Sequence, residues 1–331
     1  MHSIVQKVNN GKILNFDEVK TLFNGILTGE ISEAGIGSAL IAMKLRGETA
    51  EEVAAAATVL NEHKLKFQHS AKGTIDTCGT GGDGKSTLNV STAVSLVLAA
   101  MGIKVLKHGN MAQSGKVGSA DILDELGIPT KLDEANSHTY FNNNNFIFLF
   151  APHYHPALKN VAKVRKDLRV ATIFNYLGPM LNPGSPDYQT IGINRADKLD
   201  LYAEALKIQS RDNIIVYSSK DGYDEISSSD ITYVRHVKEG RIEKFEIAPS
   251  DFFEKFPMPV VNSKEDAKKL FLEAIEGKNE QLTDLIALNT AVSLYTMNLY
   301  SLKEGFYTAR NVIKEGSVSD KLNKMIMEKA V

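Results

Sequence analysis

The sequence predicts two parts: a small N-terminal helical domain and a larger α/β domain whose central sheet is mainly parallel. Near the N-terminus, apolar residues recur at positions i, i+3, i+4 and i+7 from Val19 onward, which is the spacing of one helix face. After Thr74, short apolar runs alternate with helical segments, a pattern typical of parallel strands covered by helices. We therefore expect a helical domain over residues 1–68 and an α/β domain over residues 72–331.

The helical domain is predicted from capping residues as well as from spacing. Asp17 stands where it can cap one helix or favour its first turn, and Ser32 is the expected N-cap of the next. Thr49 and Glu52 form a capping box for a third helix. A further helical contribution is expected around residues 160–185. The N-terminal helices carry no obvious chemistry, so we expect them to serve packing or subunit contact.

Short apolar runs mark the expected strands of the sheet. They are residues 74–78, 104–107, 146–150 and 213–217. The first two each lead into a glycine-containing loop and then a helix. Because such sheets bind ligands at the carboxyl ends of their strands, these loops are the expected site. Near the C-terminus, an apolar helix over residues 282–294 is expected to be buried, with Asn289 as a hydrogen-bonded core amide and not a site residue.

Composition narrows the functional classes. The chain has 331 residues, 43% of them hydrophobic, and a formal net charge of −2. That charge implies no whole-molecule attraction to nucleic acid or anionic membranes, so neither is expected as a partner. Cys78 is the only cysteine, which excludes an intramolecular disulfide and fits a reducing compartment. The N-terminal residues lack the apolar core of a signal peptide, and the most apolar stretch is too short to span a bilayer. A cytoplasmic location is therefore expected.

The glycine-rich loop that starts at Gly79 predicts a phosphate site. Its sequence is Gly-Thr-Gly-Gly-Asp-Gly-Lys-Ser-Thr, and the glycines let the backbone turn tightly and present N–H groups to an anion. Hydroxyl and amide side chains follow at the start of a helix, whose N-terminus also favours phosphate. These side chains belong to Ser86, Thr87, Asn89, Ser91 and Thr92. A simple strand-to-helix turn is the alternative, but one glycine would suffice for it.

The same loop formally satisfies G-x-x-x-x-G-K-[ST], the phosphate-binding pattern of nucleotide triphosphatases. Three features disfavour that interpretation. Asp83 would repel the phosphates, a polar run delays the apolar helix, and no later apolar strand ends in a clear magnesium-binding aspartate. A nucleotidase is therefore the weaker alternative.

A second glycine-containing loop follows the next expected strand. It begins Lys107-His-Gly-Asn and continues to Gly118-Ser-Ala-Asp. Lys107 is a point charge suited to phosphate, and Gly118 allows close backbone approach. Ser119 is expected to cap the next helix and to aim its dipole at the same region. Two such loops on adjacent strands predict a ligand with two separated phosphates.

Two further groups of residues complete the predicted site. Asp224 and Glu225 are adjacent carboxylates after a strand, and such oxygens suit Mg²⁺, which bridges to substrate phosphates. Arg165 can pair with a carboxylate through two hydrogen bonds. His153 and His155 have no cysteine or acidic partners at metal-ligand spacing, which argues against zinc.

In this order, the motifs resemble those of the anthranilate phosphoribosyltransferases over nearly the whole chain. The matching segments are Gly79-Thr-Gly-Gly-Asp, Asn89-Val-Ser-Thr, Lys107-His-Gly-Asn, Gly118-Ser-Ala-Asp, His155-Pro-Ala, Phe174-Asn-Tyr-Leu-Gly-Pro and Asp224-Glu225. Each is weak alone, but together they are specific. The resemblance implies transfer of phosphoribose from phosphoribosyl pyrophosphate to the amino group of anthranilate, a step of tryptophan biosynthesis. It also implies a homodimer formed through the helical domain.

The resemblance further implies roles for individual residues. Phosphoribosyl pyrophosphate would be held by Gly79, Gly82, Asp83, Thr87, Asn89, Ser91, Thr92, Lys107 and Ser119. Anthranilate would be held by Gly79, His108, Asn110, Arg165 and Gly178, with Arg165 facing its carboxylate. Two Mg²⁺ ions would be held by Ser91, Asp224 and Glu225. Because the aromatic amine is already a nucleophile, no catalytic acid or base is named.

The chain departs from the family pattern at four positions. Met111 stands where arginine is usual, and Gly115 where a second serine is common. Arg169 and Ala171 occupy the places of a usual glycine and arginine. These changes bear on the pyrophosphate contacts and on the shape of the acceptor pocket. One hypothesis is that Arg169 replaces the lost guanidinium from a shifted position.

Two other kinds of related protein are alternatives to a phosphoribosyltransferase. Pyrimidine nucleoside phosphorylases share the fold but lack the combination of Gly-Thr-Gly-Gly-Asp and Lys-His-Gly-Asn. A non-catalytic relative that binds nucleic acid would be expected to carry a basic surface and to lose the acidic metal residues. This chain has a slight acid excess and keeps Asp83, Asp224 and Glu225.

Overall fold

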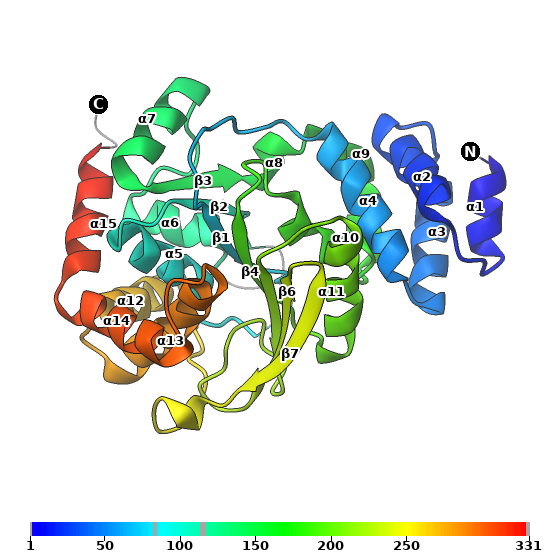
Figure 1. Ribbon diagram of the computed structural model, residues 1–331. Helices are drawn as coiled ribbons and strands as arrows, with labels where there is room; N and C mark the ends of the chain where they lie inside the picture. The colour runs from blue at the N-terminus through cyan, green and yellow to red at the C-terminus, as the bar shows by residue number, and fades with distance from the viewer. Residues whose placement is uncertain (1, 82–84, 113–116, 329–331) are drawn as a thin grey trace.

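The computed structural model describes residues 2–81, 85–112 and 117–328. Among these residues, the first four helices gather at one end of the molecule (Figure 1). They are α1 (His2–Asn9), α2 (Phe16–Thr28), α3 (Glu33–Arg46) and α4 (Ala50–His63). Ser32 caps α3, and Thr49 with Glu52 forms the predicted capping box of α4. The cap of α2 is Asn15, while Asp17 lies in the first turn, where its charge favours the helix dipole.

Within the described residues, a seven-stranded sheet forms the centre of the larger part of the chain. In spatial order its strands are β3 (Phe146–Phe150), β2 (Val105–Gly109), β1 (Ile75–Gly79), β4 (Tyr188–Gly192), β5 (Ile214–Ser219), β6 (Thr232–Lys238) and β7 (Arg241–Ile247). Strands β1 to β5 run parallel to one another, and β6 and β7 add an antiparallel hairpin. The prediction of a mainly parallel sheet is confirmed.

Of the five parallel strands of this sheet in the described residues, β4 is the one that the sequence patterns did not single out. Its residues, Tyr-Gln-Thr-Ile-Gly, include two polar side chains and so form no continuous apolar run. Gln189 is nevertheless fully buried, because its amide is paired on both sides. Its Nε2 donates to Asp76 Oδ2 at 3.0 Å, and its Oε1 accepts from Arg211 Nη2 at 2.9 Å. Hydrogen bonds to residues distant in the sequence therefore allow a polar residue in a central strand.

Helices cover both faces of the sheet (Figure 1). One face shares a hydrophobic core with α5 (Val90–Ala100), α6 (Ser119–Leu126), α7 (Glu134–Asn144), α12 (Lys264–Ile275), α13 (Glu280–Thr296), α14 (Leu302–Lys314) and α15 (Ser317–Met327). The other face shares a core with α2, α3, α4, α9 (Lys159–Leu168), α10 (Phe174–Leu177) and α11 (Leu199–Ile208). The N-terminal helices therefore pack onto the sheet domain through the second core.

The segment around residues 160–185 lies between the N-terminal helices and the sheet. Helix α9 packs against α2 and α3, and α10 contacts α4. The short α8 (Ala151–Tyr154) continues from the end of β3. The described residues also form short 3-10 helices at Pro156–Leu158, Gly178–Leu181, Ala196–Lys198 and Pro249–Asp251. In the part of the chain that the structure describes, no helix is both long enough and apolar enough to cross a membrane.

Candidate active site

The carboxyl ends of the parallel strands lie at one edge of the sheet, and the loops that leave them hold most of the predicted site residues. Strands β1 and β4 end together at Gly79 and Gly192, which are paired in register. Strand β2 ends at Gly109, level with Phe150 at the end of β3. This is the edge where open parallel sheets bind their ligands. Gly82 and Asp83, which belong to the predicted donor site, and Gly115 lie outside the described residues.

The start of α5 carries buried polar atoms suited to a polar ligand. Thr92 Oγ1 and Asn89 Oδ1 are buried and make no hydrogen bond among the described residues. Asn89 Nδ2 donates to the carbonyl of Val117 at 3.0 Å, which joins the two predicted loops. Thr87 pairs with Val260 through an isolated antiparallel bridge. The Thr92 hydroxyl can donate to a phosphate oxygen, and the Asn89 oxygen can accept from a ribose hydroxyl.

Lys107 is fully buried below the first loop. Its ammonium donates to the Thr77 carbonyl at 2.7 Å and to Ser91 Oγ at 3.3 Å. Burial lowers the pKa of Lys107 and raises that of Asp76, and attraction between the two groups opposes both shifts. In this structure Lys107 positions Ser91, which the sequence analysis named as a candidate metal ligand.

Asp224 and Glu225 follow β5, and their loop lies over the ends of β1 and β4. Asp224 Oδ2 accepts from the backbone N–H of Gly81 at 2.9 Å, which joins this loop to the glycine-rich loop. A Cβ atom on Gly79 would lie 2.5 Å from Asp224 Oδ2, and one on Gly192 would lie 1.8 Å from the Asp224 carbonyl oxygen. Position 192 therefore requires glycine if the carboxylate loop is to keep its place, whereas a side chain at position 79 would displace the Asp224 carboxylate.

Gly192 is a residue of this site that the sequence analysis missed. The only local signal is a glycine at the end of a strand, and glycines end many strands for other reasons. Its importance comes from the pairing with Gly79 and from the loop that packs on both.

Asn289 of α13 holds the carboxylate loop from another side. Its Oδ1 accepts from the backbone N–H of Ile226 at 3.0 Å. Its Nδ2 donates to the carbonyls of Ile226 at 3.1 Å and Leu285 at 2.9 Å. The expectation of a hydrogen-bonded buried amide is confirmed. Its partner Ile226 directly follows Glu225, so Asn289 also fixes the backbone next to the candidate metal ligands.

The predicted acceptor residues include a buried histidine pair. His108 and His155 have their Nε2 atoms 3.2 Å apart, so one ring donates to the other. Burial, and then the charge of Lys64, lower the pKa of His155 to about 4. Burial, followed by the neighbouring His155, also lowers the pKa of His108, against a hydrogen bond to the Gly178 backbone. Both rings are therefore neutral near pH 7, and His108 and Gly178 are brought together as predicted neighbours.

Arg165 and Asn110 occupy the remaining predicted acceptor positions. The Arg165 guanidinium lies 5.4 Å from the ring centroid of Phe174, the first residue of α10. Burial lowers the pKa of Arg165, but a guanidinium keeps its charge at neutral pH. Asn110 Oδ1 accepts from the backbone N–H of Met111 at 2.8 Å, which orients the amide at the start of the second loop.

Ser119 does not cap α6, contrary to the prediction, because Gly118 occupies the N-cap position. Asp121 Oδ2 accepts from the backbone N–H groups of Gly118 and Ala112, each at 2.9 Å. A Cβ atom on Gly118 would lie 2.3 Å from Ala112 N, so the turn also requires glycine there. A carboxylate therefore closes this loop where a serine hydroxyl was expected, and Ser119 is the first residue of the helix.

The buried His155 makes stability depend on pH. Its pKa is about 4 in the folded chain, against an ordinary value of 6.5. Below pH 6.5 the unfolded chain takes up a proton that the folded chain excludes. The free energy of unfolding is thus expected to fall by roughly 2–3 kcal/mol through this group as pH falls to about 4, and to be insensitive to it above about pH 7.

This dependence can be measured by urea unfolding at about pH 7 and about pH 4.5. His155→Gln is expected to lose less stability between the two pH values than the wild type. His153→Gln, whose side chain is exposed, serves as the control and should keep the wild-type difference. An equal loss in all three proteins would contradict the prediction.

Known protein families and relatives match nearly the whole chain. Residues 71–319 match the glycosyl transferase family, a/b domain, and residues 2–64 match the helical bundle domain of the glycosyl transferase family. The anthranilate phosphoribosyltransferase of Pyrobaculum aerophilum is 38% identical, over 98% of this chain and 98% of that protein. That of Petrotoga mobilis is also 38% identical, over 97% of this chain and 95% of that protein.

Solved structures agree with these sequence relatives. The anthranilate phosphoribosyltransferase of Thermus thermophilus superposes with a TM-score of 0.91 at 32% identity, and covers 99% of both chains. That of Saccharomyces cerevisiae, solved in complex with PRPP and Mg, has a TM-score of 0.88 at 26% identity and covers 98% of this chain and 96% of that one. This chain belongs to the anthranilate phosphoribosyltransferase family.

Membership of the anthranilate phosphoribosyltransferase family gives meaning to the positions where this chain departs from its pattern. Arg169 is the C-cap of α9 and has a φ of 54°, in the left-handed region that favours glycine. The usual glycine at this place therefore suits the backbone conformation, and arginine adopts it at some cost. Arg169 and Ala171 are exposed, as is Met111, so these departures lie at the surface of the described structure.

The carboxylate loop suits a metal that takes few ligands from the protein. Within the described residues, no group of three or more His, Cys, Asp or Glu side chains is arranged to hold a metal ion. Asp224 and Glu225, with the hydroxyl of Ser91, instead offer a small set of hard oxygens. Mg²⁺ commonly binds through one or two carboxylates and completes its shell with substrate phosphates and water. The oxygens of these residues therefore fit Mg²⁺ bound together with a phosphorylated substrate.

Proposed function

We propose that this chain transfers the phosphoribosyl group of phosphoribosyl pyrophosphate to anthranilate. The products are N-(5-phosphoribosyl)anthranilate and pyrophosphate, in a step of tryptophan biosynthesis. The observation that carries the proposal is the position of the carboxylate loop, which is joined through Asp224 and Gly81 to the glycine-rich loop at the carboxyl edge of the sheet. Relatives that match nearly the whole chain carry the name of this activity.

In the proposed complex, the donor is bound between the two glycine-containing loops. Backbone N–H groups of these loops and the start of α5 favour its phosphates. The proposed donor residues are Gly79, Gly82, Asp83, Thr87, Asn89, Ser91, Thr92, Lys107 and Ser119. The unsatisfied Thr92 hydroxyl and Asn89 oxygen support this placement. Lys107 would have to exchange its bond to Ser91 or Thr77 to touch a phosphate directly.

Two Mg²⁺ ions are proposed, held by Ser91, Asp224 and Glu225 together with the donor. When bound, Mg²⁺ neutralises the charge that develops on the departing pyrophosphate. The protein's part is to hold these oxygens in place before the substrate arrives. Lys107 positions Ser91, while Gly192 and Asn289 hold the loop of the two carboxylates. Catalysis of this kind consists mainly of positioning and charge stabilisation.

The acceptor is proposed to bind among Gly79, His108, Asn110, Arg165 and Gly178. The Arg165 guanidinium would pair with the anthranilate carboxylate through two hydrogen bonds. The neutral His108 would contact the ring or the amine without adding charge beside it. Because the amine attacks through its own lone pair, the chain needs no strong base to start the reaction.

The assembly proposed for the chain is a cytoplasmic homodimer formed through the helical domain of residues 1–68, with residues 72–331 as the donor-binding domain. Two large apolar side chains of the helical part support such a contact. Ile13 is 58% exposed and Leu45 is 80% exposed. Arg46, next to Leu45, donates a hydrogen bond to the carbonyl of Lys12, next to Ile13, so these side chains stand on adjacent segments, and contiguous exposed apolar side chains mark interaction surfaces.

The activity is tested by mixing the protein with phosphoribosyl pyrophosphate, Mg²⁺ and anthranilate and following the loss of anthranilate fluorescence. The chain contains no tryptophan, so its own indole emission does not interfere. A folded sample that shows no turnover would refute the proposal. Turnover with pyrimidine nucleoside and phosphate instead would favour the phosphorylase alternative.

Arg165→Met tests the acceptor assignment. We expect KM for anthranilate to rise about tenfold or more, because the charge-assisted hydrogen bonds to the carboxylate are lost. KM for phosphoribosyl pyrophosphate should change little. Arg169→Met is the matched comparison, and a larger effect there would support the shifted guanidinium. Unchanged anthranilate KM in the Arg165 variant would contradict its role.

Asn289→Leu tests the support behind the carboxylate loop. Removal of the amide leaves the backbone N–H of Ile226 without its buried partner, so the loop should shift. We expect the Mg²⁺ concentration for half-maximal rate to rise and kcat/KM to fall about tenfold. Thr290→Val on the same helix is the control, because the only hydrogen bond of the Thr290 hydroxyl among the described residues is to the Ile286 carbonyl of its own helix. An equal loss in both variants would indicate a general packing defect.

A further inference from the structure

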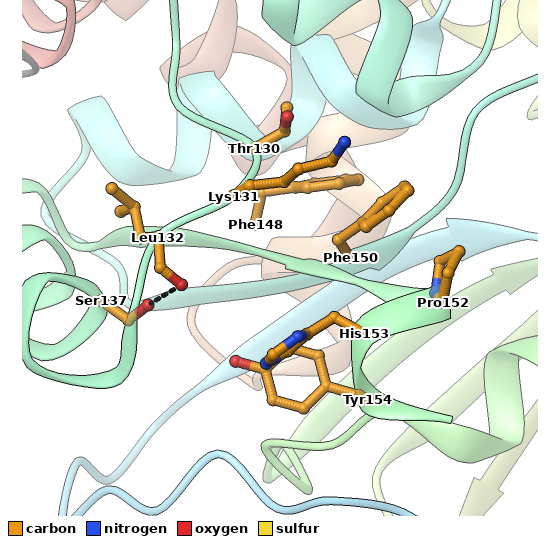
Figure 2. Close-up of a pocket in the computed structure, with 9 residues that line it drawn as sticks. All are labelled: Thr130, Lys131, Leu132, Ser137, Phe148, Phe150, Pro152, His153 and Tyr154. Atoms are coloured by element: carbon orange, nitrogen blue, oxygen red, sulfur yellow. Dashed lines mark hydrogen bonds between the residues drawn. The ribbon is translucent and has the colours of Figure 1, made fainter. Parts of the chain in front are cut away.

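A cavity lies beside β3, the edge strand of the sheet (Figure 2). Its volume is about 330 Å³, which is enough for a small organic ligand. Its walls come from β3, from α8 and from the segment between α6 and α7. None of its lining residues is among those proposed to bind donor, acceptor or metal. A ligand for this cavity therefore has to be inferred from its own lining residues.

The walls of this cavity are mainly aromatic. Phe148 and Phe150 are alternate residues of β3 and point to the same side of the strand. In the view of Figure 2, His153 and Tyr154 lie on the other side of the β3 ribbon from these two rings. The latter two rings meet edge to face, with centroids 4.9 Å apart and planes at 89°. Leu132 adds an aliphatic side. A flat aromatic ligand can stack or make edge contacts on both sides of such a space.

Lys131 gives the cavity a positive end. Its ammonium lies 5.1 Å from the ring centroid of Phe150, where it is held over the ring face. No ion pair involves Lys131 within the part of the chain that the structure describes, and no carboxylate lines the cavity. The pKa of Tyr154 is raised, first by burial of its side chain and second by the negative charge of Glu134. The Tyr154 phenol thus stays protonated at neutral pH and can donate a hydrogen bond.

We propose that this cavity is a second ligand site and that it takes a small planar aromatic carboxylate. The ring of the ligand lies among Phe148, Phe150 and Tyr154, and its carboxylate pairs with the Lys131 ammonium. A neutral apolar ligand would leave that charge unused, and a cation would be repelled by it. His155 directly follows α8, whose residues line the cavity, but neither His155 nor any of the proposed acceptor residues is itself a lining residue.

The site can be located with crystals of the full chain soaked in 4-bromobenzoate. This probe has the ring and the carboxylate but lacks the amine that the proposed reaction needs, and its bromine gives an anomalous signal. We expect signal between Phe150 and Tyr154, whether or not the probe also binds near Arg165. Signal only near Arg165, or none, overturns the proposal and leaves the proposed transferase activity untouched.

Binding in solution can be measured by ¹⁹F NMR titration with 4-fluorobenzoate. The titration is made on the Arg165→Met background, which weakens the proposed acceptor site. Addition of Lys131→Met is expected to weaken the remaining binding about tenfold, because a charge-assisted hydrogen bond is lost. Lys303→Met, on the exposed side of α14, should have no effect. Equal affinity with and without Lys131, in proteins of equal thermal stability, overturns the proposal.

Discussion

Gly192→Ala is expected to reduce kcat/KM about a hundredfold or more while the chain stays folded. A Cβ atom at this position would lie 1.8 Å from the carbonyl oxygen and 2.6 Å from the carbonyl carbon of Asp224. These are backbone atoms, so no rotation of a side chain relieves the clash. The loop of Asp224 and Glu225 must move by an ångström or more, and displacement of that size in a positioning group costs about 10²-fold in rate.

The result that identifies a displaced carboxylate loop is a change in how the rate depends on Mg²⁺ concentration. The Mg²⁺ concentration for half-maximal rate should rise in Gly192→Ala, because the ligands no longer stand where the donor phosphates need them. Gly79→Ala should have a smaller effect on this quantity, since its clash is with the end of the Asp224 side chain, at 2.5 Å. Gly37→Ala is the control, as its added Cβ makes ordinary contact with Val164 at 3.7 Å.

A measurement of unfolding free energy separates the effect of loop position on the rate from a loss of stability. Overpacking at Gly192 is also expected to cost about 1–3 kcal/mol of unfolding free energy, measured with urea. Activity is therefore compared at a temperature where every variant is folded. If Gly192→Ala shows the Mg²⁺ dependence of the wild type, the loop does not depend on this glycine and the prediction is wrong.

Local features of this chain could be predicted from the sequence because their causes are local. Ser32 and the pair Thr49 and Glu52 cap their helices through residues three positions away. The apolar run 146–150 forms a buried strand. Where two local choices compete, prediction is weaker: Gly118 takes the cap that Ser119 was expected to provide, because Asp121 supplies the hydrogen bonds.

Features that depend on distant partners could not be predicted in the same way. Strand β4 lacks an apolar run, and the partners of Gln189 are Asp76 and Arg211, which adjacency in sequence does not reveal. The position of β1 between β2 and β4 likewise brings Gly79 beside Gly192 only in the folded sheet. Side chains able to bind a substrate or a metal could therefore be proposed from their residue types, whereas the residues that hold such side chains in place could not.

Asp224→Asn and Glu225→Gln should each reduce kcat/KM about 10²–10³-fold, and should raise the Mg²⁺ requirement. Each change keeps the size of the side chain and removes one negative charge. Asparagine at position 224 can still accept from the N–H of Gly81 through its amide oxygen, so the link between the two loops is preserved. The expected loss therefore reports on charge toward the metal and not on loop structure.

A direct measurement of metal binding distinguishes loss of a metal ligand in these two variants from a general loss of activity. Mn²⁺ can replace Mg²⁺ as a spectroscopic probe, and its binding in the presence of phosphoribosyl pyrophosphate can be followed by electron paramagnetic resonance. Both variants should bind Mn²⁺ more weakly than the wild type, whereas anthranilate affinity should be unchanged. Glu239→Gln, an exposed residue at the turn between β6 and β7, makes the same chemical change elsewhere and should alter neither quantity. Wild-type Mn²⁺ affinity and rate in both site variants would refute the metal role, because two hard ligands cannot be lost without weakening a site that has so few.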